Sequence, residues 1–353
     1  MQYQLNPTFK SLKTGVNTYI IGSRMHRQLE LEIDPADLQY LLAFSTPISF
    51  QDAIESLSSP IDHEEAKQLF DGFVEAKLII PTLSKTDAFY SKRYDRQIGL
   101  FNAFSLGNGA SKQALLANAR IALIGIGGVG SYVLYTLAAM GVGFVRAVDF
   151  DKVEESNLSR QILYGEDDVN KQKINAAKNR ITSINKELKY EFIDVFVDTE
   201  EKITDIINDV DFCILAADTP RGKIQHYTNN ACMKSGTPYI FGYSVLDSLT
   251  VGPMVIPGSD SACLNCLAAP PDLSDPLDIA YNNTFTSTLI DPYNALAGNF
   301  VALEVIKYIT GFNAPTLLGK QMIMELDSYN ITLLEISRDH DCQLHDIGKR
   351  TNL

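Results

Sequence analysis

Ile121-Ala122-Leu123-Ile124-Gly125-Ile126-Gly127-Gly128-Val129-Gly130 is the stretch that decides the fold. A run of apolar residues leads into the pattern G-x-G-G-x-G, which is typical of a strand-to-helix junction. Glycine lets the chain turn tightly there and brings backbone N–H groups close to phosphate, at the positive end of the helix dipole. The stretch therefore predicts a nucleotide site that includes Gly125, Gly127, Gly128 and Gly130.

Strand and helix patterns alternate on both sides of this turn. Strand-like segments occupy residues 120–125, 143–148, 189–195 and 210–217, and helix-like segments occupy 127–140 and 171–185. Alternation at this spacing is typical of a doubly wound, mostly parallel α/β sheet of the Rossmann type.

A smaller α+β module is predicted before it, over residues 14–81. Residues 17–21 and 29–33 have strand patterns, and the second alternates apolar with charged side chains. Three helix starts follow, and this order resembles a winged-helix module; the expected starts are at Asp34, Ser49 and Asp62.

The polar stretch 82–110 separates the two patterns. We therefore expect an N-terminal domain over residues 1–85 and a nucleotide-binding domain over residues 86–353.

The composition is that of a globular protein, with 353 residues, 45% hydrophobic and 21% charged. The net charge of −13 argues against nucleic acid as a partner, because a phosphate backbone needs a concentrated basic surface. Residues 1–13 are polar, unlike a signal peptide, and the apolar run 121–133 is too short to span a membrane. The five cysteines have no disulfide-framework spacing. We expect a cytoplasmic protein without a membrane partner.

The residues after the second predicted strand favour ATP over NAD. Asp149 follows the last glycine by 19 positions, where a carboxylate that bonds ribose hydroxyls is expected. Asp151 can face the same side, whereas a dehydrogenase needs only the first acid. Asn157, Arg160 and Gln161 then supply the polar groups and the planar cation that suit a triphosphate with magnesium.

Two further residues complete the predicted site. Lys173, on the next helix, is a candidate phosphate contact. Asp218 follows the strand 210–217, at the end of the sheet where open α/β folds bind ligands. Structural interpretations stay open beside these: a tight turn without a ligand for the glycines, and a helix cap for Asp218.

Four separated blocks resemble the ThiF/MoeB and ubiquitin-activating superfamily of adenylating enzymes. They are Arg93-Tyr94-Asp95-Arg96-Gln97, the glycine turn, residues 149–161 and Ala216-Ala217-Asp218. The resemblance covers about residues 90–311.

This resemblance implies a role for each matched residue. The glycine turn and Asp149 would hold ATP, and Asp218 would hold magnesium and be needed for adenylation. Arg96 would reach into the site of a partner subunit, so a homodimer with composite active sites is implied. The residues that would bind the triphosphate are Asn157, Arg160, Gln161 and Lys173.

Within the superfamily the chain is most similar to enzymes that modify ribosomally made peptides, those of microcin C and pantocin A biosynthesis. The total length, the extra module at 14–81 and the block 161–169 carry this similarity. It implies ATP-dependent adenylation of a carboxylate on a precursor peptide, whose leader the N-terminal domain would clamp by adding a strand to a sheet edge. The strand 29–33 is the candidate edge, with a purely structural strand as the alternative.

Two metal-ligand pairs lie far apart in the sequence. Cys263 and Cys266 form a C-x-x-C pair, and Cys342 and His345 form a C-x-x-H pair. Such pairs can close a tetrahedral structural zinc site. The superfamily often carries four cysteines here, so His345 departs from its pattern, and a site that has lost its metal is the alternative.

The segment 282–299, where ubiquitin-activating relatives carry a thioester-forming cysteine, contains no cysteine. We therefore expect a substrate nucleophile to capture the activated acyl group, by cyclisation, condensation or nucleotidylation. Three other functions stay open: a sulfur-carrier adenylyltransferase of molybdopterin or thiamine biosynthesis, an NAD-dependent dehydrogenase, and a non-catalytic peptide-binding module.

Overall fold

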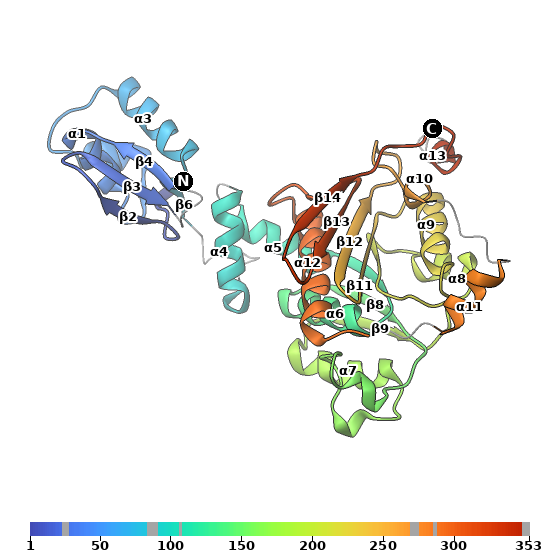
Figure 1. Cartoon of the computed structure of the whole chain (residues 1–353). Helices are drawn as coiled ribbons and strands as arrows, with labels where there is room; N and C mark the ends of the chain where they lie inside the picture. The colour runs from blue at the N-terminus through green and yellow to red at the C-terminus, as the bar shows by residue number, and fades with distance from the viewer. Residues whose placement is uncertain (23–27, 83–90, 106–107, 269–274, 285–287, 348–353) are drawn as a thin grey trace. The chain divides into compact units, whose positions relative to one another are not determined.

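The computed structural model describes residues 1–22, 28–82, 91–105, 108–268, 275–284 and 288–347. The chain divides into two compact units, Met1–Ala114 and Leu115–Leu353, and each is described by itself (Figure 1). The predicted domains 1–85 and 86–353 stay a prediction.

The second unit contains an eight-stranded sheet in the order β14-β13-β12-β11-β10-β7-β8-β9. The strands from β11 to β9 in this order run parallel, and β12, β13 and β14 continue the sheet antiparallel. The predicted α/β, mostly parallel sheet is confirmed. Its strands are β7 (Arg120–Ile124), β8 (Phe144–Val148), β9 (Lys189–Ile193), β10 (Phe212–Leu215), β11 (Tyr239–Val245), β12 (Ser248–Val255), β13 (Lys320–Glu325) and β14 (Ile331–Glu335).

Helices cover both faces of this sheet, which is why its inner strands are apolar throughout. All four residues of β10 are buried. On β7, Ala122 and Ile124 pack into the cluster around α8 (Glu200–Ile206) and α9 (Ile224–Ser235). Their neighbours along β7 point to the opposite face, because side chains alternate along a strand. There α6 (Gly128–Met140) packs against α12 (Asp291–Thr310) and α7 (Lys173–Ile184).

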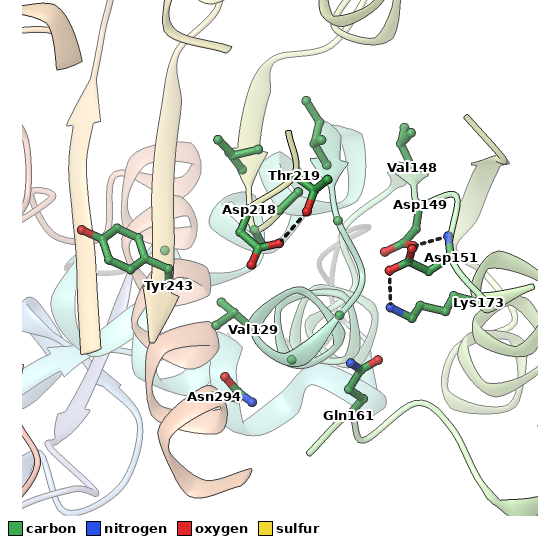
Figure 2. Close-up of a pocket in the computed structure, with 18 of the residues that line it drawn as sticks. Val129, Val148, Asp149, Asp151, Gln161, Lys173, Asp218, Thr219, Tyr243 and Asn294 are labelled. Carbon is green, nitrogen blue, oxygen red and sulfur yellow. Dashed lines mark hydrogen bonds and ion pairs between the residues drawn. The ribbon is translucent and has the colours of Figure 1, made fainter. Parts of the chain in front are cut away.

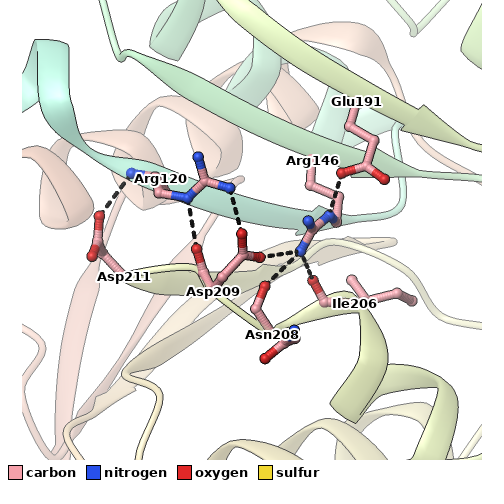
Figure 3. Close-up of polar contacts among 7 residues, drawn as sticks. All are labelled: Arg120, Arg146, Glu191, Ile206, Asn208, Asp209 and Asp211. Carbon is pink, nitrogen blue, oxygen red and sulfur yellow. Dashed lines mark hydrogen bonds and ion pairs between the residues drawn. The ribbon is translucent and has the colours of Figure 1, made fainter.

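A cluster of arginine bonds fixes the turn between α8 and β10 (Figure 3). The Nη1 atom of Arg146 donates to the carbonyl oxygens of Ile206 (2.9 Å) and Asn208 (2.7 Å) and to the Asp209 carboxylate (3.1 Å). Arg120 donates from Nε to the carbonyl oxygen of Asp209 and from Nη2 to its carboxylate. Asp209 has a φ of 60°, an uncommon backbone conformation for a residue other than glycine, and the arginines at the start of β7 and in the middle of β8 stabilise the turn that contains it.

The first unit contains two three-stranded antiparallel sheets, β5-β1-β6 and β2-β3-β4. The strands predicted at 17–21 and 29–33 are β3 and β4, each displaced by one residue. The sequence did not predict β1, β2, β5 or β6. The strands are β1 (Gln2–Leu5), β2 (Lys10–Lys13), β3 (Thr18–Gly22), β4 (Gln28–Glu32), β5 (Ile48–Ser49) and β6 (Ile79–Pro81).

All three predicted helix starts are confirmed by their caps. The carboxylate of Asp34 accepts from the N–H groups of Ala36 and Asp37 at 2.8 and 2.9 Å, ahead of α1 (Pro35–Ala43). Ser49 caps α2 (Phe50–Glu55), and Asp62 caps α3 (His63–Glu75). The winged-helix likeness stays a prediction. Two further helices follow, α4 (Asp95–Phe104) and α5 (Gly109–Asn118).

Within the described residues, β4 pairs only with β3 and is therefore an edge strand, as predicted for 29–33. None of the helices in the described part of the chain is both long enough and apolar enough to cross a bilayer.

Candidate active site

The glycine turn requires glycine because a side chain at several of its positions would clash with neighbouring atoms. Gly125 has a φ of 89°, and a Cβ added there would lie 2.8 Å from the carbonyl oxygen of Ala216 at the end of β10. A Cβ on Gly130 would lie 2.0 Å from the carbonyl oxygen of Gly125, and one on Gly128 would lie 2.5 Å from Nδ2 of Asn294. The turn therefore holds α6 against β7, β10 and α12, with its N-terminus at the end of the sheet.

A cavity of about 500 Å³ opens at this N-terminus, at the carboxyl ends of the parallel strands (Figure 2). Its volume suits a nucleotide, since ligand pockets commonly measure about 300–1,000 Å³. The structure brings most of the predicted site residues together on its wall. These are Gly125, Gly127, Gly128, Asp149, Asp151, Asn157, Arg160, Gln161, Lys173 and Asp218.

Two predicted residues do not line this cavity. Gly130 lies one turn into α6, where its role is the close contact with Gly125. Arg96 lies in the first unit, exposed on α4, and its role in a partner's site stays a prediction.

Asp149 is 9% exposed, and its carboxylate bonds the backbone of the glycine turn. Its two carboxylate oxygens accept from the N–H groups of Ile126 (2.8 Å) and Asp151 (2.9 Å). Burial raises the pKa of Asp149, while the charge of Lys173 and the two N–H bonds act in the opposite direction. Each oxygen keeps a lone pair for a ribose hydroxyl. On the other side of the turn, the Tyr164 hydroxyl donates to the carbonyl oxygen of Ile126 at 2.8 Å.

A buried ammonium group lies beside Asp149. Lys173 begins α7 and is 5% exposed, and its Nζ lies 2.9 Å from the Asp151 carboxylate. The Asp151 side chain is half-exposed, whereas that of Lys173 is buried. Both residues line the cavity. A buried cation needs a paired anion, and a polyphosphate entering the cavity would supply further negative charge.

Gln161 supplies a polar group without a partner. It is 6% exposed, and its Oε1 atom has no hydrogen-bond partner among the described residues. A buried amide oxygen left without a bond costs about 1–3 kcal/mol. Because Gln161 lines the cavity, a hydroxyl or amino group of a bound nucleotide can satisfy it. Together with the glycine cradle, this supports the fit of the site to ATP.

Asn157 and Arg160 have structural bonds as well. The Oδ1 atom of Asn157 accepts from the N–H group of Glu154 at 3.1 Å. The guanidinium of Arg160 donates to the carbonyl oxygen of Ser156, and the carbonyl oxygen of Arg160 accepts from Asn294 at 3.4 Å. These bonds hold both side chains on the cavity wall.

Asp218 lies across the glycine turn from Asp149 and Asp151 (Figure 2). Its carboxylate lies 3.2 Å from Nη2 of Arg221 and accepts from the Thr219 hydroxyl at 3.2 Å. The Asp218 side chain is 64% exposed, and exposed ion pairs contribute about 0–1 kcal/mol. Magnesium prefers carboxylate oxygens and could replace this weak partner. The magnesium role of Asp218 stays a prediction.

Sequence reasoning missed several residues of the cavity wall. Asn294 is buried at 2% exposure near the start of α12, far along the chain from the glycine turn that it contacts. Nothing local marks it, since only the packing of α12 on α6 brings it there. Other missed residues include Arg221, Gln225, Tyr243 and Ser244.

The predicted metal ligands also come together. The Sγ atom of Cys263 lies 3.8 Å from that of Cys266 and 3.7 Å from that of Cys342. The Cys266 sulfur lies 3.2 Å from Nε2 of His345, and all four ligand atoms lie within 4.8 Å of one another. Zn–S bonds of about 2.3 Å in a tetrahedron place two sulfurs about 3.8 Å apart. The donor set therefore fits zinc with His345 as a ligand.

Burial raises the pKa of the Cys263 thiol to about 12. A thiolate at this position therefore needs a neighbouring cation, which is what a zinc ion would provide.

The sequence profile of the ThiF family matches residues 94–344. The chain belongs to the ThiF family. It is 36% identical over 205 residues to the sulfur carrier protein ThiS adenylyltransferase of Bacillus subtilis, a match that spans 58% of each protein. It is 29% identical over 253 residues to a sulfur carrier protein adenylyltransferase of Thermus thermophilus, which covers 71% of this chain and 89% of that protein. These names agree with the predicted class, an ATP-using adenylating enzyme.

Solved structures extend the match to the first unit. The structure of Escherichia coli MccB with ATP superposes with a TM-score of 0.85 at 26% identity and covers 98% of this chain and 100% of that one. PaaA superposes with a TM-score of 0.71 at 24% identity, over 93% and 98% of the two chains, which shows a shared fold. The predicted membership of the ThiF family is confirmed, and MccB and PaaA are structural neighbours of this chain.

Proposed function

We propose that this protein uses ATP to adenylate a carboxylate of a ribosomally synthesised precursor peptide, in the maturation of an antibiotic of the microcin C or pantocin type. The extent of the structural match carries this proposal. MccB accounts for 98% of this chain, whereas the Thermus sulfur-carrier enzyme uses 89% of its own length to match only 71% of this chain. Residues 1–93, which precede the ThiF profile, thus have a counterpart in a peptide-modifying enzyme. One MccB structure is a complex with N-formylated MccA.

In the proposed reaction, a carboxylate oxygen of the substrate attacks the α-phosphorus of ATP, and the bond to the β-phosphate oxygen breaks to release pyrophosphate. The protein mainly positions the reactants and neutralises charge. The glycine turn offers its N–H groups to phosphate, and Asp149 orients the ribose. Arg160 and Lys173 offset the charge on the phosphate oxygens. Magnesium, held by Asp218, would add to this neutralisation when bound.

The activated acyl group is consumed by a nucleophile of the substrate. No cysteine lies between residues 282 and 299, so transfer through an enzyme thioester in that segment is ruled out. A cyclised, a condensed and a nucleotidylated product are all compatible with this step. Mass spectrometry of the treated peptide separates loss of water from gain of a nucleotide.

Pyrophosphate exchange tests the proposal directly. A short peptide encoded beside this gene should stimulate ATP–pyrophosphate exchange, and Asp218→Ala should reduce the exchange by orders of magnitude while the protein still folds. The second candidate is a sulfur-carrier adenylyltransferase, which the names of the curated relatives favour. Exchange that responds to a carrier protein ending in Gly-Gly, and to no peptide, would establish that candidate instead.

Nucleotide binding and pyrophosphate exchange together test two more distant alternatives. Tight NAD binding without ATP binding would indicate a dehydrogenase, and unchanged exchange in Asp218→Ala would indicate a non-catalytic peptide-binding module.

We also propose a homodimer in which each site receives Arg96 from the partner subunit. Mixing two inactive variants tests this arrangement, because Arg96→Ala and Asp218→Ala subunits would together form one complete site. Activity should return on mixing. A mixture that stays inactive, although mixed dimers form, would show that Arg96 acts in its own subunit.

Zinc at the Cys263, Cys266, Cys342 and His345 cluster is proposed as a structural ion. Four protein ligands leave no open position for water, so it would take no part in the chemistry.

A further inference from the structure

A groove of about 510 Å³ lies between β4 and α3 in the first unit. Leu29 and Leu31 of β4 line it, and they share one side of the sheet because they are two residues apart. Leu69 and Phe73 of α3 line it from the helix, one turn apart on the same face. The groove therefore has an apolar stretch formed by these four side chains and runs beside an edge strand.

A glycine keeps this groove open. Gly72 lies inside α3 and lines the groove, and a Cβ added there would meet no atom within 4 Å. Packing therefore does not require glycine at this position, although glycine in a helix interior costs about 1 kcal/mol relative to alanine. The missing side chain leaves room for a side chain of another molecule.

Three carboxylates stand at the same groove: Asp34, Asp37 and Glu65. None of the ion pairs found among the described residues includes any of them. Burial raises the pKa of Asp37, and the charges of Asp34 and Glu65 raise it further. The carboxylates thus lie close enough to repel one another, and a cation entering the groove would relieve this repulsion.

We propose that the groove selects an extended peptide segment that combines apolar side chains with at least one lysine or arginine. This rests on the proposed function and on the expectation, implied by the family resemblance, that the N-terminal domain clamps the leader of the precursor peptide. A segment lying along β4 presents every second side chain to the same face, so apolar residues would pack on Leu29, Leu31 and the space at Gly72. The basic residue would face Asp37 and Glu65. The same carboxylates would reject an acidic segment.

Three labelled nonapeptides test this selectivity by fluorescence anisotropy with the full chain. All carry leucine at two alternate positions, the next position on the same face carries lysine, glutamine or glutamate, and serine fills the positions between, so that the leucines and the test residue all face the groove. The lysine probe should bind at least tenfold more tightly than the glutamate probe, with the glutamine probe between them. Equal affinities for the lysine and glutamate probes would overturn the proposal.

Two variants, each with a matched control, locate the effect. Glu65→Gln should weaken the lysine probe at least threefold, whereas Glu64→Gln, the matched change on the exposed neighbour outside the groove, should leave it within error. Gly72→Leu should fill the groove and weaken the lysine and glutamine probes at least tenfold, and Gly72→Ala, which preserves the helix, should give a smaller loss. Equal effects of Glu65→Gln and Glu64→Gln, or full binding to a folded Gly72→Leu, would contradict the assignment.

Pyrophosphate exchange separates this inference from the proposed function. If a precursor peptide drives exchange and its KM does not change in Glu65→Gln or Gly72→Leu, the groove assignment fails and the proposed function stands. If the lysine probe binds as expected but no peptide drives exchange, the proposed function fails and the groove stands as a peptide site.

Discussion

Replacing Gly130 with alanine should disable the phosphate cradle through a single methyl group. The added Cβ would start 2.0 Å from the carbonyl oxygen of Gly125 and 2.9 Å from its carbonyl carbon, both backbone atoms that cannot rotate away. Because carbon contacts settle near 3.5–4.0 Å, α6 must move by about 1 Å or more relative to the turn. Overpacking of this kind costs about 1–3 kcal/mol, and a misplacement of about 1 Å can cost a hundredfold in function.

The assay is ATP affinity by isothermal titration calorimetry, since it needs no peptide substrate. We expect Gly130→Ala to bind ATP at least a hundredfold more weakly and to unfold at a lower urea concentration. Gly165→Ala is the matched control, because a Cβ there meets nothing within 4 Å. Its affinity should stay within twofold of wild type. A Gly130→Ala protein with ATP affinity within tenfold of wild type and unchanged stability would refute the reasoning.

Three further outcomes follow from contacts described above. His345→Ala should lower the zinc content per chain, measured by plasma mass spectrometry after dialysis against a chelator, whereas His340→Ala, an exposed histidine nearby, should not; equal zinc in both would remove His345 from the site. Lys173→Met should raise the pKa of Asp149 further, because Lys173 lowers it now. Only the carboxylate form accepts both ribose hydroxyls, so ATP affinity should fall at a higher pH than in wild type as the pH decreases; an unshifted profile would exclude the coupling. Arg146→Leu should lower the free energy of unfolding by about 1–2 kcal/mol in urea titrations, because it removes the bonds to two carbonyl groups and to the half-exposed carboxylates of Glu191 and Asp209, of which Asp209 keeps Arg120. A loss below about 0.5 kcal/mol would mean that the turn supports itself.

The parts of the fold that were predictable are those fixed by neighbouring residues. The G-x-G-G-x-G turn, the apolar strands β7 and β10 and the caps at Asp34 and Asp62 all depend on residues within a few positions. β1 was missed because it is stabilised by β5 and β6, whose residues lie more than forty positions away. Its own four residues, Gln2–Leu5, show too short a pattern to separate it from a loop.

The candidate site also has residues that could be predicted from the local sequence and residues that could not. The residues from Asp149 to Lys173 follow the glycine turn in a recognisable order, so their position could be predicted. Asn294 could not, because α12 reaches the cavity only once the sheet has assembled, whereas Arg221 lies three positions after the predicted Asp218 and was overlooked. The ion pair between Asp151 and Lys173, 22 positions apart, could not be predicted either.

The metal cluster also has a consequence for folding. Cys263 and Cys342 are separated by 79 positions, and α12, β13 and β14 lie between them. An ion that joins the two would act as a cross-link that closes this loop. A cross-link of that length lowers the entropy of the unfolded chain and stabilises the folded state by about 4–5 kcal/mol. This cross-link can form only after residue 345, the last of the four ligands, has left the ribosome. The last two strands of the sheet, β13 and β14, would thus be secured late, after the nucleotide cradle at residues 121–130 has already been synthesised.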